Sequence, residues 1–176
     1  TDDSTQPRVT DGLAFINKKG LEMYAKKLVH SMMTNDEFYY IMGGHSAAAG
    51  HGNMWRESYT AVMERAVKDI FATVGLNFIG RNYAMGGTSS APEIAMCVKE
   101  IFGTDIDVLS WDTGMTDGRN FAGMQQYFLR AAMLPNRPAF VALHMGGSRQ
   151  NLMKELEEIG LTSLVLDPGE ESEKIN

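Results

Sequence analysis

The chain has 176 residues, of which 44% are hydrophobic, and a formal net charge of −6, so it fits one domain with a sizeable core. Its single cysteine, Cys97, excludes an intramolecular disulfide and the CxxC spacing of zinc or redox motifs. The basic residues are scattered and no apolar run approaches the ~20 residues that cross a bilayer, which argues against nucleic-acid partners and membrane spans.

Two elements are predicted at the start of the chain. Apolar residues recur at helical spacing from Leu21 onward and indicate an amphipathic helix that ends near residues 34–36, so residues 1–36 are predicted to form an N-terminal helical extension. Residues 38–42 form a short apolar, aromatic-rich run that breaks at Gly43 and Gly44, as a buried strand ending in a tight turn would.

The middle of the chain alternates between helical and strand patterns. Residues 59–74 keep apolar side chains on one face and predict a long helix, and residues 76–79 predict a second strand. Ser90 with Glu93 matches a capping box at the start of a further helix. In that helix Cys97 falls on the apolar face, so it is predicted to be a core residue.

The alternation continues to the end, with predicted strands at 106–111, 139–143 and 161–166 and predicted helices at 121–133 and 152–159. Strands this apolar cannot face water, and strict alternation with helices predicts a parallel sheet covered on both faces. We therefore expect an α/β fold, a three-layer α/β/α sandwich with a five-stranded parallel sheet over residues 37–168. Residues 169–176 are predicted to form a polar tail.

Ligands of open parallel sheets bind beyond the carboxyl ends of the strands, and glycine and small polar residues crowd the segments there: 43–53, 82–90, 112–118 and 144–147. Glycine lets backbone N–H groups approach a ligand closely, and a serine at a strand-to-helix turn presents its hydroxyl beside such donors. This chemistry suits acyl transfer. Glycine-rich turns can also have no role other than reversing the chain. Glycine content alone therefore does not distinguish a ligand site from ordinary turns.

Three of these segments carry a specific pattern. The first strand is followed by Gly-Gly-His-Ser ending at Ser46, Asn82 is followed five residues later by Gly87, and the third strand is followed by Gly-Met-Thr-Asp, which contains Thr116. The sequence resembles the GDSL/SGNH hydrolase family, which has a flavodoxin-like sandwich and the blocks Gly-Asp-Ser, Asn with an oxyanion-hole Gly, Gly-x-Asn-Asp and Asp-x-x-His. The resemblance implies that Ser46 is the nucleophile, that Gly87 donates its backbone N–H, and that Thr116 takes the place of the oxyanion Asn.

The sequence departs from this family at three points. His45 replaces the aspartate before the nucleophile, Thr116 replaces the asparagine, and the Asp-x-x-His block, which supplies the general base, is absent because no histidine follows His144. We interpret the missing block as truncation of the chain. Alternatively, His45, His51 or His144 replaces the base, although each also fits an ordinary hydrogen-bonded role.

Other chemistry at the same edge is less favoured. The histidines with Asp112 and Asp117 could form a metal site, but they lack the tight spacing of metal-ligand motifs, so no metal or cofactor is predicted. Trp111 and Tyr83 could stack on a sugar, but packing against neighbouring side chains is the simpler role. Three methionines are predicted on buried faces: Met42, Met63 and Met96.

Two functions remain in competition. The first is a serine esterase or carbohydrate deacetylase that acts on acyl esters of small molecules or glycans, with a histidine as the base. The second is a catalytically inactive protein of the same fold, which binds a glycan or serves as a structural subunit of a larger assembly. The chain begins without methionine, so the sequence leaves its cellular location open.

Overall fold

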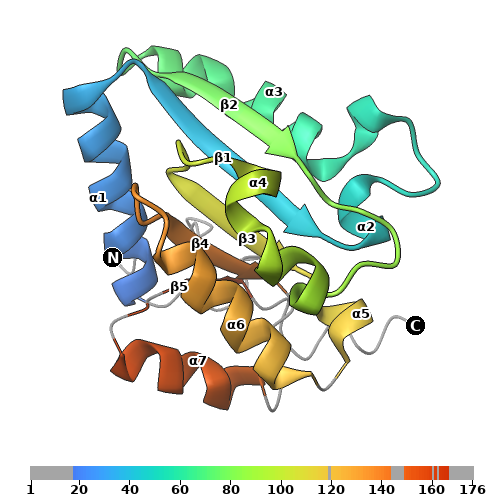
Figure 1. The fold of residues 1–176 in the computed structure, drawn as a ribbon. Helices are drawn as coiled ribbons and strands as arrows, with labels where there is room; N and C mark the ends of the chain where they lie inside the picture. Colours follow the sequence, from blue (N-terminus) through green and yellow to red (C-terminus); the bar gives the residue numbers. More distant parts are fainter. Residues whose placement is uncertain (1–17, 119, 144–148, 160, 162, 167–176) are drawn as a thin grey trace, which may run out of the picture.

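The computed structural model describes residues 18–118, 120–143, 149–159, 161 and 163–166. Its strands form one parallel sheet in the order β2-β1-β3-β4-β5 (Figure 1). The strands are β1 (Glu37–Gly44), β2 (Asn77–Asn82), β3 (Val108–Asp112), β4 (Ala139–Leu143) and β5 (Ser163–Leu166). The helices are α1 (Lys18–Thr34), α2 (Ser46–Ala49), α3 (Tyr59–Ala72), α4 (Val98–Phe102), α5 (Gly114–Asp117), α6 (Phe121–Ala132) and α7 (Arg149–Glu158). The predicted α/β fold with a parallel sheet is confirmed.

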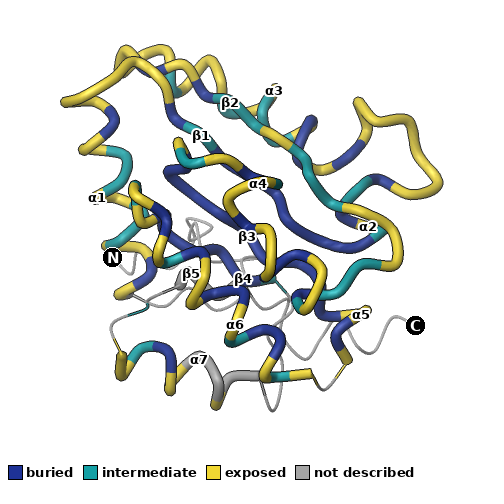
Figure 2. The backbone as a smooth tube through the Cα atoms, in the orientation of Figure 1, coloured by how far each residue is buried: buried dark blue, intermediate teal, exposed yellow. Residues whose placement is uncertain are grey.

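Helices cover both faces of this sheet. Alternation along β1 sends Phe38, Tyr40 and Met42 into one buried cluster, whereas Ile41 enters the cluster on the opposite face. Side chains of α1 and α3 pack against the first cluster, and side chains of α4, α6 and α7 build the second. Figure 2 shows the resulting buried central strands. Burying one large apolar side chain stabilises the fold by about 2 kcal/mol, so these two clusters hold the three layers together.

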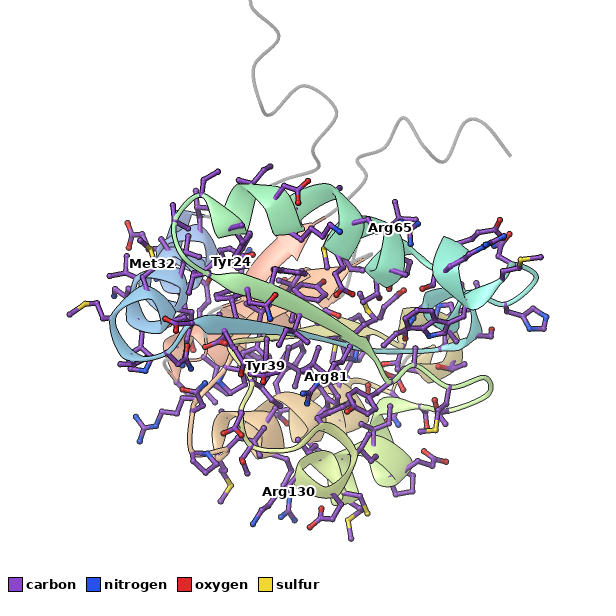
Figure 3. The ribbon with its side chains drawn as sticks, turned by 90° about the horizontal axis from the view of Figure 1, so that it is seen from above. Tyr24, Met32, Tyr39, Arg65, Arg81 and Arg130 are labelled. Carbon is purple, nitrogen blue, oxygen red and sulfur yellow. The ribbon has the colours of Figure 1, made fainter. Side chains whose placement is uncertain are left out.

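The long helices are amphipathic. In α6 the buried residues recur at helical spacing and face the sheet, whereas Arg130 lies on the exposed side (Figure 3). Within the described part of the chain, no helix combines the length and the apolar character needed to cross a membrane. At the outer edge of the sheet, the Arg81 guanidinium of β2 lies 4.6 Å from the centroid of the Tyr39 ring, and this charge helps to protect the edge (Figure 3).

The first strand runs further than predicted. Gly43 and Gly44 do not form a turn but continue β1, where they pair with Trp111 and Asp112. Close packing explains why both residues are glycine. A Cβ at Gly43 would lie 2.7 Å from the Tyr127 hydroxyl oxygen, and a Cβ at Gly44 would lie 2.5 Å from the Ala48 Cβ. The chain turns only after Gly44. Because β1 is longer than predicted, it ends two residues before Ser46, the first residue of α2.

The prediction that Cys97 and Met96 are buried is wrong, because both side chains are exposed. The segment is not one regular helix: a helical turn, η2 (Ser90–Ile94), is followed by a break, and α4 starts after Cys97, whose φ is −127°. The break changes which positions face the sheet. The capping partner also differs, since the Ser89 hydroxyl donates to Glu93 and Ser90 is engaged elsewhere.

Candidate functional site

The topology brings the candidate residues to one edge of the sheet. Strand β1 lies between β2 and β3, so the connections leave it in opposite directions, and crevices beyond such a strand are the usual ligand sites of doubly wound folds. Ser46 is the first residue of α2, directly beyond β1. The His45 N–H donates to the Asp112 carbonyl at 2.9 Å, which joins the ends of β1 and β3 beneath Ser46.

The loop after β2 lies beside Ser46. The Met85 N–H donates to the Gly44 carbonyl at 3.0 Å, and a Cβ built on Gly86 would lie 3.7 Å from the Ser46 Cβ. Gly87 follows with φ +75°, a conformation that favours glycine. The backbone N–H groups of Ser46 and Gly87 donate to no other described residue, and neither does the Ser46 hydroxyl. The Ser46 hydroxyl and two backbone N–H groups that have no partner among the described residues therefore lie close together, at the start of α2 and in the loop after β2.

His45 has a different role from the one predicted for a general base. Its Nδ1 accepts a hydrogen bond from the Ala47 N–H at 3.1 Å and thereby caps α2, and its Nε2 lies 3.7 Å from Asp112 Oδ1. The side chain is buried. An imidazole whose two nitrogens face an amide donor and a carboxylate has no lone pair for the Ser46 proton, so His45 positions α2 in this structure.

Asp112 receives a second donor from α3. The Tyr59 hydroxyl donates to Asp112 Oδ2 at 2.9 Å, although 36% of the Tyr59 side chain is exposed. Burial of the hydroxyl end, with Asp112 beside it, raises the pKa of Tyr59 above its ordinary value. Tyr59 thus stays a neutral donor, and its hydroxyl, together with the buried Asp112 and His45, supports the start of α2.

Thr116 lies on the same edge but does not offer its hydroxyl to a ligand. The Thr116 hydroxyl donates to the Thr113 carbonyl at 3.0 Å inside α5, and the residue is exposed. The neighbouring Asp117 is buried and accepts hydrogen bonds from Ser90 and Thr113. The arrangement of α5 in this structure therefore presents no side-chain amide or free hydroxyl in the position expected of the oxyanion asparagine.

The remaining candidates are placed as follows. His51 is exposed in the turn after α2, where its N–H donates to the Ser46 carbonyl at 2.9 Å. His144 lies outside the described residues. Trp111 is fully buried and Tyr83 packs edge-on against Phe102, which confirms packing as their role. Among the described residues no three His, Cys, Asp or Glu side chains gather as metal ligands.

Sequence reasoning missed two contributors to this edge. Only Gly87 matches the family spacing, so Gly86 was not predicted to belong to the site. Nevertheless, a Cβ atom at Gly86 would contact the Ser46 side chain. Tyr59 was assigned to an apolar helix face, and nothing in its local sequence shows that its hydroxyl reaches Asp112 at 53 residues' separation. Both depend on contacts between loops that are distant in the sequence.

No protein-family model and no curated protein matches the chain. Solved structures do match. A two-domain esterase (CEX) active on acetylated mannans, crystallised with mannopentaose, has a TM-score of 0.66 at 15% identity, covering 89% of this chain and 44% of that one. AlinE4, an SGNH-hydrolase family esterase, has a TM-score of 0.53 at 14% identity, covering 75% and 76%. A catalytic mutant of Axe2, an acetylxylan esterase from Geobacillus stearothermophilus, has a TM-score of 0.51 at 12% identity, covering 74% and 75%.

These likenesses define the fold class. A parallel sheet in the order β2-β1-β3-β4-β5, with Ser46 directly beyond its inner strand β1, belongs to the doubly wound α/β/α sandwiches. Within that class, the chain has the fold seen in the SGNH-hydrolase esterases. It spans less than half the length of the two-domain esterase.

Proposed function

We propose that this protein is an SGNH-type ester hydrolase in which Ser46 is the nucleophile. The observation that carries the proposal is the placement of the Ser46 hydroxyl beyond β1 with the glycine loop beside it. The proposal gains support from the N–H groups of Ser46 and Gly87, which have no partner among the described residues and suit a developing oxyanion. The likeness to esterases agrees with it, whereas no observation favours a structural subunit without catalysis.

In the proposed reaction the Ser46 Oγ attacks the acyl carbon and its proton passes to a base. The carbonyl oxygen becomes an oxyanion held by the two N–H groups, the alcohol leaves with a proton, and water then releases the acid. Of the three histidines named as possible replacements for the base, His51 and His144 are proposed, because His45 is engaged at both nitrogens. Variants of these two histidines separate them: replacing the base by alanine removes the activity, whereas replacing the other leaves it.

Acetylated polysaccharides are the first substrates to test, because the CEX structure is described as active on acetylated mannans. The assay follows acetate release from acetylated glucomannan and the hydrolysis of a nitrophenyl acetate by the full chain. Ser46→Ala is expected to lose at least ~1,000-fold in rate with an unchanged unfolding curve. Thr73→Ala, which removes an exposed hydroxyl at the end of α3, is the matched control and should keep full activity.

Equal rates in Ser46→Ala and the unaltered protein would exclude Ser46 as the nucleophile. If the unaltered protein binds acetylated glucomannan without releasing acetate, the catalytic proposal is wrong and the non-catalytic binding alternative is correct. Binding is measured by calorimetry with the same preparation.

A further inference from the structure

The loop that carries Gly86 and Gly87 runs from the end of β2 to η2, and its first end is tied to β1 and α2. The Tyr83 N–H donates to the Met42 carbonyl at 2.9 Å, and the next bond to β1 starts at Met85. The Asn82 side chain accepts from the Ala84 N–H at 3.0 Å and donates to the Ala48 carbonyl at 2.8 Å. The start of the loop therefore has a fixed position relative to Ser46.

The middle of the loop has few contacts of its own. Met85, Gly86 and Gly87 are exposed, and among the described residues the one side-chain hydrogen bond there runs from the Thr88 hydroxyl to the Met85 carbonyl at 2.8 Å. A glycine pair in an exposed segment has wide conformational freedom. The position of the Gly87 N–H must therefore be set largely by the two ends of the loop.

The second end is held by a buried carboxylate. Ser90 is fully buried, its N–H donates to Asp117 Oδ1 at 2.7 Å, and its hydroxyl donates to Asp117 Oδ2 at 2.5 Å. The Thr113 hydroxyl donates to the same Asp117 Oδ2 at 2.9 Å. The Trp111 indole N–H donates to the Ser90 hydroxyl at 2.6 Å. Side chains of β3 and of the segment after it, up to the end of α5, thus hold the last residue of the loop in place.

These hydrogen bonds are directional, so they constrain both the position of Ser90 and the direction in which the chain leaves the loop. A buried carboxylate is tolerated only where hydrogen bonds compensate its lost hydration, so Asp117 cannot release Ser90 without a large penalty. Because Ser90 bonds through both its backbone and its side chain, the direction in which the chain leaves the loop is constrained along with its position. Figure 1 shows α5 beside the helical turn that precedes α4.

From this network we infer that Asp117 is a positioning residue: its carboxylate anchors Ser90 and so fixes the loop that presents the Gly87 N–H to the reaction centre at Ser46. The inference rests on the proposed function for its catalytic consequence, but the anchoring itself is independent of it. Asp117 touches no substrate in this scheme and acts through the loop.

The test has one arm that does not depend on activity. Backbone amide NMR relaxation at Gly86 and Gly87 is compared in the unaltered protein, Asp117→Asn, Asp117→Ala and Ser90→Ala. With the anchor lost, the order parameters of both glycines are expected to fall from about 0.85 toward 0.6 or below. Asp117→Asn keeps an acceptor for the Ser90 N–H and should show an intermediate fall. Glu93→Gln, which alters an exposed carboxylate bonded to the neighbouring Ser89, is the matched control and should change nothing.

The second arm measures ester hydrolysis by the same variants. A displaced oxyanion donor is expected to lower kcat by about 10- to 100-fold with little change in KM, since the donor acts in the transition state. Unchanged order parameters in Ser90→Ala and Asp117→Asn overturn the inference, even if Asp117→Ala fails to fold. Loosened glycines with kcat unchanged overturn the catalytic consequence. If the loop loosens but the unaltered protein hydrolyses no ester, the anchor stands and the proposed function fails.

Discussion

His45 and Asp112 are joined twice at the floor of the site, through the His45 N–H to the Asp112 carbonyl and through His45 Nε2, 3.7 Å from Asp112 Oδ1. The same imidazole caps α2 through Nδ1. Where the GDSL/SGNH pattern has aspartate, this chain thus has a residue that supplies a side-chain acceptor at the start of α2.

His45→Ala is expected to lower the free energy of unfolding by about 1 kcal/mol, because the helix cap is lost. His45→Asn retains a side-chain acceptor for the Ala47 N–H and should lose less. Urea unfolding measures both. Since the proposed base is His51 or His144, the pH dependence of kcat/KM should keep its shape in His45→Asn. Loss of the acidic limb in that variant would instead make His45 the base.

Gly86→Ala tests how close the glycine loop lies to Ser46. The new methyl group would make an ordinary van der Waals contact with the Ser46 Cβ at 3.7 Å, and the φ of Gly86 lies outside the left-handed region. The fold should therefore tolerate the change within about 0.5 kcal/mol, whereas the space over the nucleophile shrinks. We expect KM for bulky esters to rise several-fold while acetate esters are less affected. Equal KM values for both ester sizes would place the loop away from the substrate.

Gly44→Ala provides the contrasting case. A Cβ there would lie 2.5 Å from the Ala48 Cβ and 2.9 Å from the Asp112 carbonyl oxygen, so backbone or α2 must move. Such overpacking is expected to cost about 1 to 3 kcal/mol of stability, and displacement of α2 should reduce hydrolysis as well. The midpoint of urea unfolding for Gly44→Ala and Gly86→Ala should differ clearly. Similar midpoints would show that Gly44 is not packed as described.

The sequence predicted the layers of this fold well because apolar runs and helical stripes report burial directly. The strand at residues 139–143 was located with its observed limits, and the helix at 121–133 within one residue. Errors arose where tertiary contacts override local pattern. The break before α4 exposes Cys97, and two glycines that read as a turn are strand residues packed under Tyr127 and Asp112.

The candidate site was predicted less completely. Spacing placed Ser46 and Gly87 beyond the ends of β1 and β2 at one edge of the sheet, where the structure has them, because residues beyond parallel strands share that edge. Spacing could not show where side chains point. The Thr116 hydroxyl turns back to its own helix, and His45 turns inward to Asp112. Both outcomes depend on hydrogen-bond partners that only the folded chain brings together.

Thr116→Ala is expected to leave hydrolysis within about two-fold of the unaltered protein, because the hydroxyl is already engaged with Thr113 and its loss removes no oxyanion donor. Thr116→Asn adds an amide donor at the exposed position. If the new amide reaches the oxyanion, kcat should rise, since removing one oxyanion donor from other hydrolases lowers kcat by about 10²-fold or more. A large loss of kcat in Thr116→Ala would show that the hydroxyl rotates to serve the reaction.

Alkaline pH is expected to destabilise the fold through its buried tyrosines. Burial raises the pKa of Tyr24 to about 12, with Asp107 adding to the shift, and burial also raises the pKa values of Tyr40 and Tyr127. Because the folded pKa values exceed the unfolded value of 10.0, stability is fully retained below pH 10.0 and falls as pH rises through the folded values.

The expected slope is about 1 kcal/mol per pH unit for each tyrosine that ionises only on unfolding. Urea unfolding at a series of pH values, with tyrosinate absorbance read on the folded protein, measures it. Tyr24→Phe removes one of the tyrosines with a raised pKa and should reduce the slope, while the stability below pH 10.0 reports the cost of losing the hydroxyl. A folded protein that shows full tyrosinate absorbance near pH 10.0 would contradict the burial of these rings.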